Sequence, residues 1–234
     1  HDLIGPAGGG EHTGESQGFR NGRARRDARH IELRIAGDDD VVAAVERLAD
    51  AVPMAKALVA GGVLAIEVTL RTPVALDAMR AIAAEVEGAH VGAGTVITPA
   101  DFAAAERAGA RFAVSPGATA TLVAAAADSA LPWLPGVATA SEAMAALERG
   151  HRHLKLFPAE AAGGTALLRG LHGPLPGLRF CPTGGITPAS AGNYLALPNV
   201  ACVGGSWLTP ADRMAAGDWP RIEALAREAS ALRP

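Results

Sequence analysis

The chain has 234 residues, 49% of them hydrophobic and 19% charged, with 21 basic against 24 acidic side chains. A net charge of -3 and an aromatic content of only 4% argue against the basic surface and the stacking platforms that nucleic-acid binding needs. No apolar run reaches the roughly 18 residues of a membrane-spanning helix, and Cys181 and Cys202 lack the spacing of a zinc site or a disulfide framework. We expect a soluble, cytoplasmic protein without a metal and without a nucleic-acid or membrane partner.

Residues 1–40 are rich in Gly, Arg, Asp and Ser and contain few apolar side chains. Such a segment cannot bury enough surface to offset the entropy that it would lose on ordering. Its arginine cluster at 23–26 is not followed by the apolar core of a signal peptide. We therefore expect a disordered or artefactual extension over 1–40 and a folded region over 41–234.

From residue 41 onward, short apolar runs alternate with Ala-rich or amphipathic stretches of helical period. In chain order, the pattern predicts a short strand at 41–45, a helix near 51–60, a strand at 63–70, a helix at 73–87, a strand at 90–96, a helix at 99–108, a strand at 111–116, a helix at 119–129, a strand at 131–136, a helix at 139–149, a strand at 153–158, a helix at 163–171, a strand at 179–185, a helix at 187–196, a strand at 199–205 and a last helix near 218–231. Such alternation indicates a parallel sheet built from βαβ units. Eight units predict an α/β fold, a single-domain TIM (β/α)8 barrel. A doubly wound open sheet is the alternative, because the segment 41–45 is short and Ala-rich.

Several predicted helices also carry local signals at their ends. Thr98-Pro99 and Thr187-Pro188 each place a capping side chain before a proline at the first helical position. Gly109 stands where the C-terminal glycine of a helix belongs. Gly150 has the same place after the helix at 139–149.

The predicted strand at 63–70 ends in the run Glu67-Val68-Thr69-Leu70, which Arg71 follows. With a period of two, Glu67, Thr69 and Arg71 share one face of this strand. The active site of such a barrel lies at the C-terminal ends of its strands. A glutamate and an arginine there indicate acid–base chemistry beside a carboxylate-binding group, and an internal ion pair is the alternative.

Lys155 lies between two leucines in the predicted strand at 153–158. Burial disfavours a charged ammonium group, and a neutral amine is the nucleophile that Schiff-base formation requires. The only other lysine, Lys56, falls in a predicted helix. Lys155 is therefore the candidate for covalent catalysis, unless it reaches solvent or forms a salt bridge.

Two glycine pairs end the last two predicted strands, in the strings T-G-G at 183–185 and G-G-S at 204–206. Adjacent glycines allow backbone N–H groups to approach an anion closely, and the loops after strands seven and eight are the common phosphate site of this fold. Either pair alone could serve only a tight turn. The string G-A-G-T at 92–95 lacks the third glycine of a dinucleotide-binding loop, so Thr95 is expected to point its hydroxyl into the mouth.

Together, these segments resemble the 2-keto-3-deoxy-6-phosphogluconate (KDPG) aldolases, whose close relatives cleave 4-hydroxy-2-oxoglutarate (KHG). The resemblance covers about 51–232, and the matching strings keep their order. They are AVPMAKALVAGG (51–62), EVTLRTP (67–73), VGAGTV (91–96), AVSPG (113–117), PGVAT (135–139), LKLFPAE (154–160), FCPTGGI (180–186) and GGSWL (204–208).

This resemblance implies that Lys155 forms a Schiff base with a 2-keto acid and that Glu67 moves protons. It implies further that the remaining site residues bind substrate: Arg71 and Thr95 at the pyruvyl end, Pro116 along the same mouth, and Thr183, Gly184, Gly185, Gly205 and Ser206 at the phosphate. Such enzymes are metal-free homotrimers of single-domain barrels. The expected partner is a phosphorylated 2-keto acid, no cofactor is expected, and the products would be pyruvate and glyceraldehyde 3-phosphate.

The chain departs from this family at its first strand. The family has a longer β-branched run such as V-I-P-V-I, whereas residues 38–50 read DDDVVAAVERLAD. This difference puts closure of the barrel in question. KHG is the alternative substrate. The alternative functions are a sugar-phosphate isomerase or epimerase that uses Glu67 without covalent chemistry, and a non-catalytic barrel that binds an acidic ligand.

Overall fold

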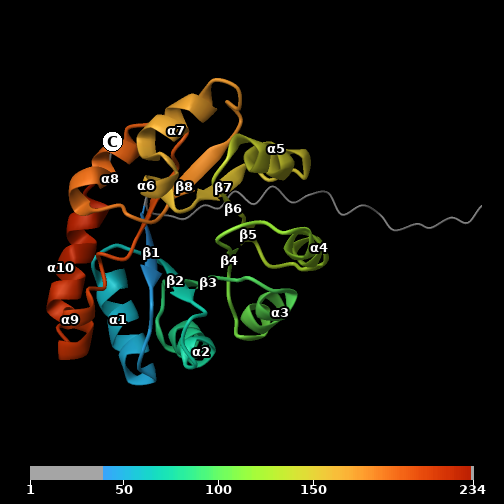
Figure 1. Ribbon diagram of the computed structural model, residues 1–234. Coiled ribbons are helices and arrows are strands. Elements are labelled where there is room, and N and C mark those ends of the chain that lie inside the picture. The colour runs from blue at the N-terminus through green and yellow to red at the C-terminus, as the bar shows by residue number, and fades with distance from the viewer. Residues whose placement is uncertain (1–38, 233–234) are drawn as a thin grey trace, which may run out of the picture.

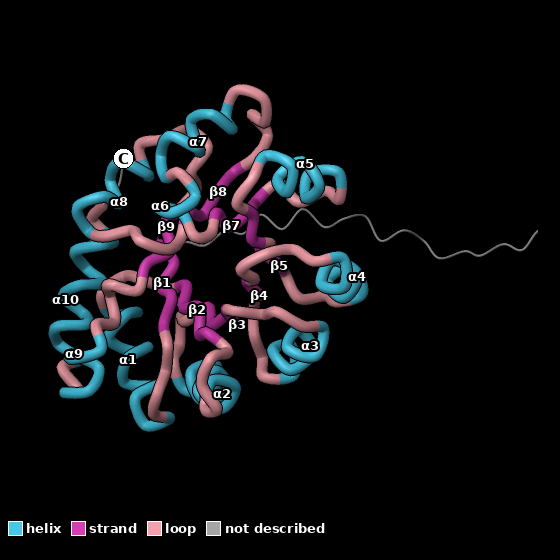
Figure 2. Tube along the Cα trace, viewed as in Figure 1, coloured by secondary structure: helices cyan, strands magenta, loops and turns pink. Residues whose placement is uncertain are grey.

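The computed structural model describes residues 39–232, and the extension predicted over 1–40 lies outside this range except for its last two residues. Parallel strands alternate with helices, and the helices surround the strands (Figure 1 and Figure 2). The strands are β1 (Asp39–Ala43), β2 (Ala65–Thr69), β3 (His90–Gly94), β4 (Ala113–Val114), β5 (Trp133–Leu134), β6 (Gly136–Val137), β7 (His153–Leu156), β8 (Arg179–Pro182) and β9 (Val203–Gly205). The helices are α1 (Leu48–Ala60), α2 (Ala75–Glu85), α3 (Pro99–Arg107), α4 (Ala120–Asp128), α5 (Ala140–Glu148), α6 (Ala159–Ala162), α7 (Gly164–His172), α8 (Pro188–Leu195), α9 (Ala211–Ala216) and α10 (Trp219–Ser230). No helix in this range is long and apolar enough to cross a membrane.

The strands close on themselves. Hydrogen-bonded neighbours run in the orders β5-β4-β3-β2-β1-β9 and β6-β7-β8. β5 and β6 are two halves of one strand interrupted at Pro135, whose carbonyl still accepts the Lys155 N–H at 2.9 Å. Two isolated bridges, Phe180–Val200 and Thr183–Gly204, join the β8 and β9 segments. The predicted (β/α)8 barrel is confirmed, and the open sheet is wrong.

The first strand completes the barrel in spite of its composition. β1 covers Asp39–Ala43, two residues earlier than the predicted strand at 41–45. It pairs with β2 in the register Val42–Glu67 and with β9 in the register Val41–Gly205. Aspartate is a poor strand former, but pairing on both sides outweighs intrinsic propensity.

Most predicted helices appear with ends shifted by a few residues, and the local signals are confirmed. The Thr98 hydroxyl accepts the Asp101 N–H at 3.1 Å, and the Thr187 hydroxyl caps α8 in the same way. The helix predicted at 163–171 is confirmed as α7, and the backbone turns just before it at Gly163 with φ of 124°. Two short helices, α6 and α9, were not predicted.

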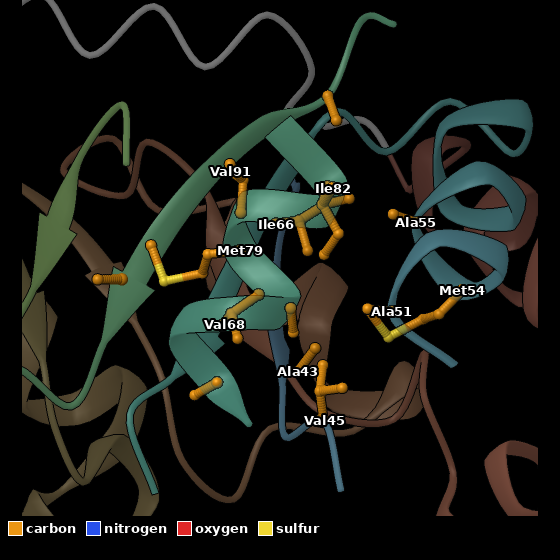
Figure 3. Close-up of a cluster of buried hydrophobic side chains, with 14 of the residues drawn as sticks. Ala43, Val45, Ala51, Met54, Ala55, Ile66, Val68, Met79, Ile82 and Val91 are labelled. Atoms are coloured by element: carbon orange, nitrogen blue, oxygen red, sulfur yellow. The ribbon is translucent and has the colours of Figure 1, made fainter. Parts of the chain in front are cut away.

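Apolar side chains fill both sides of the barrel wall. Figure 3 shows the outer side, where Ile66 and Val68 of β2 pack among side chains of α1 and α2. A smaller cluster groups residues of β4, β5 and β8 with residues just before β4 and β9. It consists of Phe112, Val114, Leu134, Cys181 and Cys202. The side-chain period of two along β4, β5 and β8 puts this cluster inside the barrel. The predicted polar binding residues, in contrast, follow the C-terminal ends of the strands.

Candidate active site

Lys155 of β7 and Glu67 of β2 meet inside the barrel. The Lys155 Nζ donates hydrogen bonds to the two carboxylate oxygens of Glu67, at 3.2 Å to Oε1 and 3.4 Å to Oε2. Lys155 is 5% exposed and Glu67 is 1% exposed. A buried ion pair adds little net stability, because the loss of hydration offsets the attraction between the charges. The pair does provide a direct path for a proton between the ammonium group and the carboxylate.

The alternation of side chains along each strand turns both groups inward. Ile66 and Val68 are fully buried against the helices, so Glu67 between them faces the barrel interior. Leu154 and Leu156 likewise belong to the outer core, and Lys155 faces inward. Lys155 thus forms the salt bridge that was the alternative to a catalytic role, but its partner is Glu67, the second catalytic candidate.

The surroundings of the pair are shaped by residues that sequence analysis did not assign. A Cβ atom at Gly94 of β3 would overlap the Glu67 carboxylate, so this glycine makes the space that Glu67 occupies. The Lys155 Nζ lies 5.4 Å from the centroid of the Phe157 ring, within reach of a cation–π interaction. The spacing of Gly92 and Gly94, two residues apart on the neighbouring strand, is the signal from which this clearance could have been inferred.

Three predicted substrate-binding residues follow the ends of β2, β3 and β4. Thr95 has φ of 58° and is the only non-glycine residue with positive φ within 39–232. Backbone strain of this kind gathers at functional sites. Arg71 is exposed and lies two residues past the end of β2, so the face predicted for Glu67, Thr69 and Arg71 stops at Thr69. Pro116 is half-buried beyond β4. Glu67 pairs with Lys155, and the internal Glu67–Arg71 ion pair is not formed.

The two glycine strings lie side by side, because the Thr183–Gly204 bridge joins them. Gly184 and Gly185 have φ of 98° and 84°, a region that L side chains rarely adopt. Thr183 is buried, and its hydroxyl donates to the Cys181 carbonyl at 3.5 Å. A Cβ at position 205 would overlap the Trp207 ring, whereas Ser206 is exposed. The structure brings the predicted phosphate-binding residues to one edge of the barrel.

Cys181 lies beside Lys155 in the register of β7 and β8. It is a buried, free thiol. A hydrogen bond with Cys202 and the nearby charge of Lys155 lower the pKa of the Cys181 thiol, against the opposing effect of burial. Among residues 39–232, no group of three or more His, Cys, Asp or Glu side chains could hold a metal ion.

Comparison with known proteins identifies relatives of this chain. The aldolase family model described as KDPG and KHG aldolase matches residues 38–225. The KHG/KDPG aldolase of Escherichia coli (strain K12) is 56% identical over 188 residues, which cover 80% of this chain and 88% of that protein. The crystal structure of KDPG aldolase from Legionella pneumophila, with pyruvate captured at low pH as a covalent carbinolamine intermediate, has a TM-score of 0.81 at 45% identity and covers 84% of this chain and 97% of that chain. The KDPG aldolase of Zymomonas mobilis ZM4 with 3-phosphoglycerate has the same TM-score at 47% identity, over 85% and 93% of the two chains. The chain belongs to the KDPG and KHG aldolase family.

Proposed function

We propose that this chain is a class I aldolase that cleaves KDPG to pyruvate and glyceraldehyde 3-phosphate through a Schiff base on Lys155. The observation that carries the proposal is the buried pair of Lys155 and Glu67, 3.2 Å apart inside a closed barrel. The relative from Legionella pneumophila holds pyruvate as a covalent carbinolamine, the adduct that an amine forms with a ketone carbon. Lys155 is the only lysine on a strand of this chain.

In the first half of the proposed reaction, Glu67 takes a proton from the Lys155 ammonium group. The amine lone pair then attacks the C2 ketone carbon, and the carbinolamine forms. Glu67 returns a proton to the departing hydroxyl, which leaves as water and yields the protonated imine. The short distance between Nζ and Oε1 allows one carboxylate to serve both transfers.

In the second half, the protonated imine accepts the electron pair of the C3–C4 bond. The C4 hydroxyl loses its proton to Glu67, directly or through a water, and glyceraldehyde 3-phosphate leaves. The enamine that remains takes at C3 the proton that Glu67 received from the C4 hydroxyl. Hydrolysis of the imine then releases pyruvate and restores Lys155.

The other predicted residues have binding roles in this proposal. The guanidinium group of Arg71 can take the substrate carboxylate through two parallel hydrogen bonds, and Thr95 and Pro116 line the same end. The backbone N–H groups of the G-G pairs at 184–185 and 204–205, with Thr183 and the Ser206 hydroxyl, would bind the phosphate. What supports this assignment is the joining of both strings by one bridge and the positive φ of the 184–185 pair.

KHG is the second candidate substrate, because the family model and the Escherichia coli relative are both described by the two substrates. KHG has no phosphate. Each charge-assisted hydrogen bond to a phosphate contributes about 1.5–3 kcal/mol. Two or three of them would favour KDPG by about 10²-fold or more in kcat/KM. Equal kcat/KM values would assign the chain as a KHG aldolase.

The family resemblance also supports a homotrimer and a cytoplasmic location, which we propose for this chain. Light scattering would measure the mass of the assembly, and fractionation of the source cells would locate it. A monomer, or recovery with the membrane fraction, would contradict these two proposals.

Borohydride reduction in the presence of pyruvate tests the chemistry. The reduced adduct should map to the peptide that contains Lys155, and Lys155→Ala should lose both the adduct and turnover. Since the chain has only one other lysine, Lys56→Ala is a matched control that should keep both. An adduct on Lys56, or release of pyruvate from KDPG without any adduct, would overturn the proposal. Turnover of a sugar phosphate by isomerisation or epimerisation, without an adduct, would favour the isomerase or epimerase alternative. Pyruvate binding with neither an adduct nor turnover would favour the non-catalytic barrel.

A further inference from the structure

A hydrogen bond joins an acidic side chain on the helix after β7 to the helix after β8. Glu160, the second residue of α6, is exposed, yet its Oε1 accepts a hydrogen bond of 2.6 Å from the Tyr194 hydroxyl. Tyr194 is 1% exposed and belongs to α8. The two helices lie next to each other (Figure 1). The pair therefore links the segment that follows Lys155 to the segment that follows the T-G-G string.

The same helix holds the T-G-G string through its backbone. The Ala159 N–H donates to the Thr183 carbonyl at 2.8 Å, and the Glu160 N–H donates to the Gly184 carbonyl at 3.1 Å. These are the first two N–H groups of α6, which have no partner inside the helix. The conformation of the string is thus tied to the position of α6.

The backbone of the G-G pair also packs against the stem of Glu160. A Cβ at Gly185 would lie 2.7 Å from the Glu160 Cβ and Cγ, and one at Gly184 would lie 3.2 Å from the Phe157 ring. On the other side, a Cβ at Gly164 would lie 3.1 Å from the Tyr194 hydroxyl and 3.4 Å from the Glu160 Oε2. The exposed glutamate therefore has the G-G pair on one side and the start of α7 on the other.

The hydrogen bond from Tyr194 fixes the position of the charge on Glu160. An unrestrained carboxylate next to the G-G pair would repel a bound phosphate dianion. Burial, and then the hydrogen bond and charge of Glu160, raise the pKa of the Tyr194 phenol above its usual range. The phenol keeps its proton at neutral pH and donates to the carboxylate, which is the stronger, charge-assisted kind of hydrogen bond.

We propose that Glu160 and Tyr194 are positioning residues for the substrate phosphate. Neither touches the substrate. Tyr194 holds the Glu160 side chain, and the Glu160 stem sets the backbone of Gly184 and Gly185 so that their N–H groups meet the phosphate. The proposal rests on the proposed function, because the phosphate site is part of it.

Steady-state kinetics on KDPG and on phosphate-free KHG test the proposal. Tyr194→Phe removes the donor, and Glu160→Ala removes the stem. Each variant should raise KM for KDPG about tenfold with little change in kcat, below the roughly 10²-fold cost that a 1 Å misplacement can reach. KM for KHG should change less than twofold. Glu160→Gln keeps the stem and an acceptor oxygen and should restore KM for KDPG to within about twofold of wild type.

The double variant should be no worse than Glu160→Ala, because a coupled interaction is lost only once. Thermal melts identify any variant that fails to fold. Because Glu160 is exposed, Glu160→Ala should fold even if a substitution of the buried Tyr194 does not. Equal losses on both substrates, an unchanged KM for KDPG, or a Glu160→Gln variant as impaired as Glu160→Ala would overturn the positioning role. Trapping of pyruvate on Lys155 in the wild type separates the two proposals, since its absence would overturn the proposed function itself.

Discussion

Gly94→Ala should move the proton-transfer group without touching the proposed nucleophile. An ideal Cβ at Gly94 would lie 2.5 Å from the Glu67 Cγ and 2.7 Å from its Cδ, and would overlap Oε1. Carbon atoms in contact are ordinarily about 3.5–4.0 Å apart, so the carboxylate must shift by on the order of 1 Å. The backbone at position 94 does not have positive φ, so alanine adds no conformational strain of its own.

Such a shift would act on kcat. The Lys155 Nζ and the Glu67 Oε1 are 3.2 Å apart, and about 1 Å of added separation takes them out of hydrogen-bond range. Misplacement on this scale can cost about 10²-fold in rate, and complete loss of a general acid–base costs about 10²–10⁴-fold. We expect kcat for KDPG to fall about 10²-fold with a small change in KM. Overpacking should also destabilise the fold by about 1–3 kcal/mol.

The assay is steady-state release of pyruvate, together with the rate at which borohydride traps pyruvate on Lys155. Gly92→Ala is the matched control on the same strand, since the three atoms nearest its Cβ would all belong to the Phe112 ring rather than to Glu67. It should lower the melting temperature similarly and leave kcat within about threefold, because overpacking alone is a stability effect. A folded Gly94→Ala protein with wild-type kcat, or the same kcat loss in both variants, would show that the space at Gly94 does not set the position of the Glu67 carboxylate.

Three further outcomes are expected. Glu67→Gln keeps the shape of the side chain but removes its proton-carrying capacity, so turnover should slow by about 10²–10⁴-fold; near-native turnover would give the proton role to another group. Gly185→Val should remove the preference for KDPG over KHG, because φ is 84° and a Cβ would lie 2.7 Å from Glu160, while pyruvate trapping persists; loss of trapping as well would show a general defect. Burial, with the charge of Arg149, lowers the pKa of His151. The unfolded state then binds more protons, so stability should decline as pH falls below about 6.5. His151→Phe should reduce the fall in melting temperature between pH 7 and pH 5. An unchanged fall would contradict this expectation.

Most of the helices and strands could be predicted from the sequence, because their signals are local. A helix cap spans three residues, as in the bond from the Asp101 N–H to Thr98, and the side-chain period of a strand spans two. Glycine at a helix end is equally local, and both Gly109 and Gly150 have positive φ. The alternation of these signals was enough to predict the barrel, and the inward period placed Lys155 and Glu67 inside it.

Which residues come into contact depends on the tertiary structure. Lys155 and Glu67 are 88 positions apart, and their contact depends on the register of a closed barrel. Pairing on two sides likewise makes a strand of Asp39–Ala43 against local propensity, and the end of β2 at Thr69 separates Arg71 from the face that a period of two had assigned to it. Glu160 and Tyr194 are 34 positions apart and read as an ordinary surface residue and an ordinary core residue. Both bonds depend on the closed barrel, which turns side chains of β2 and β7 into one interior and, through the pairing of β7 with β8, sets α6 beside α8.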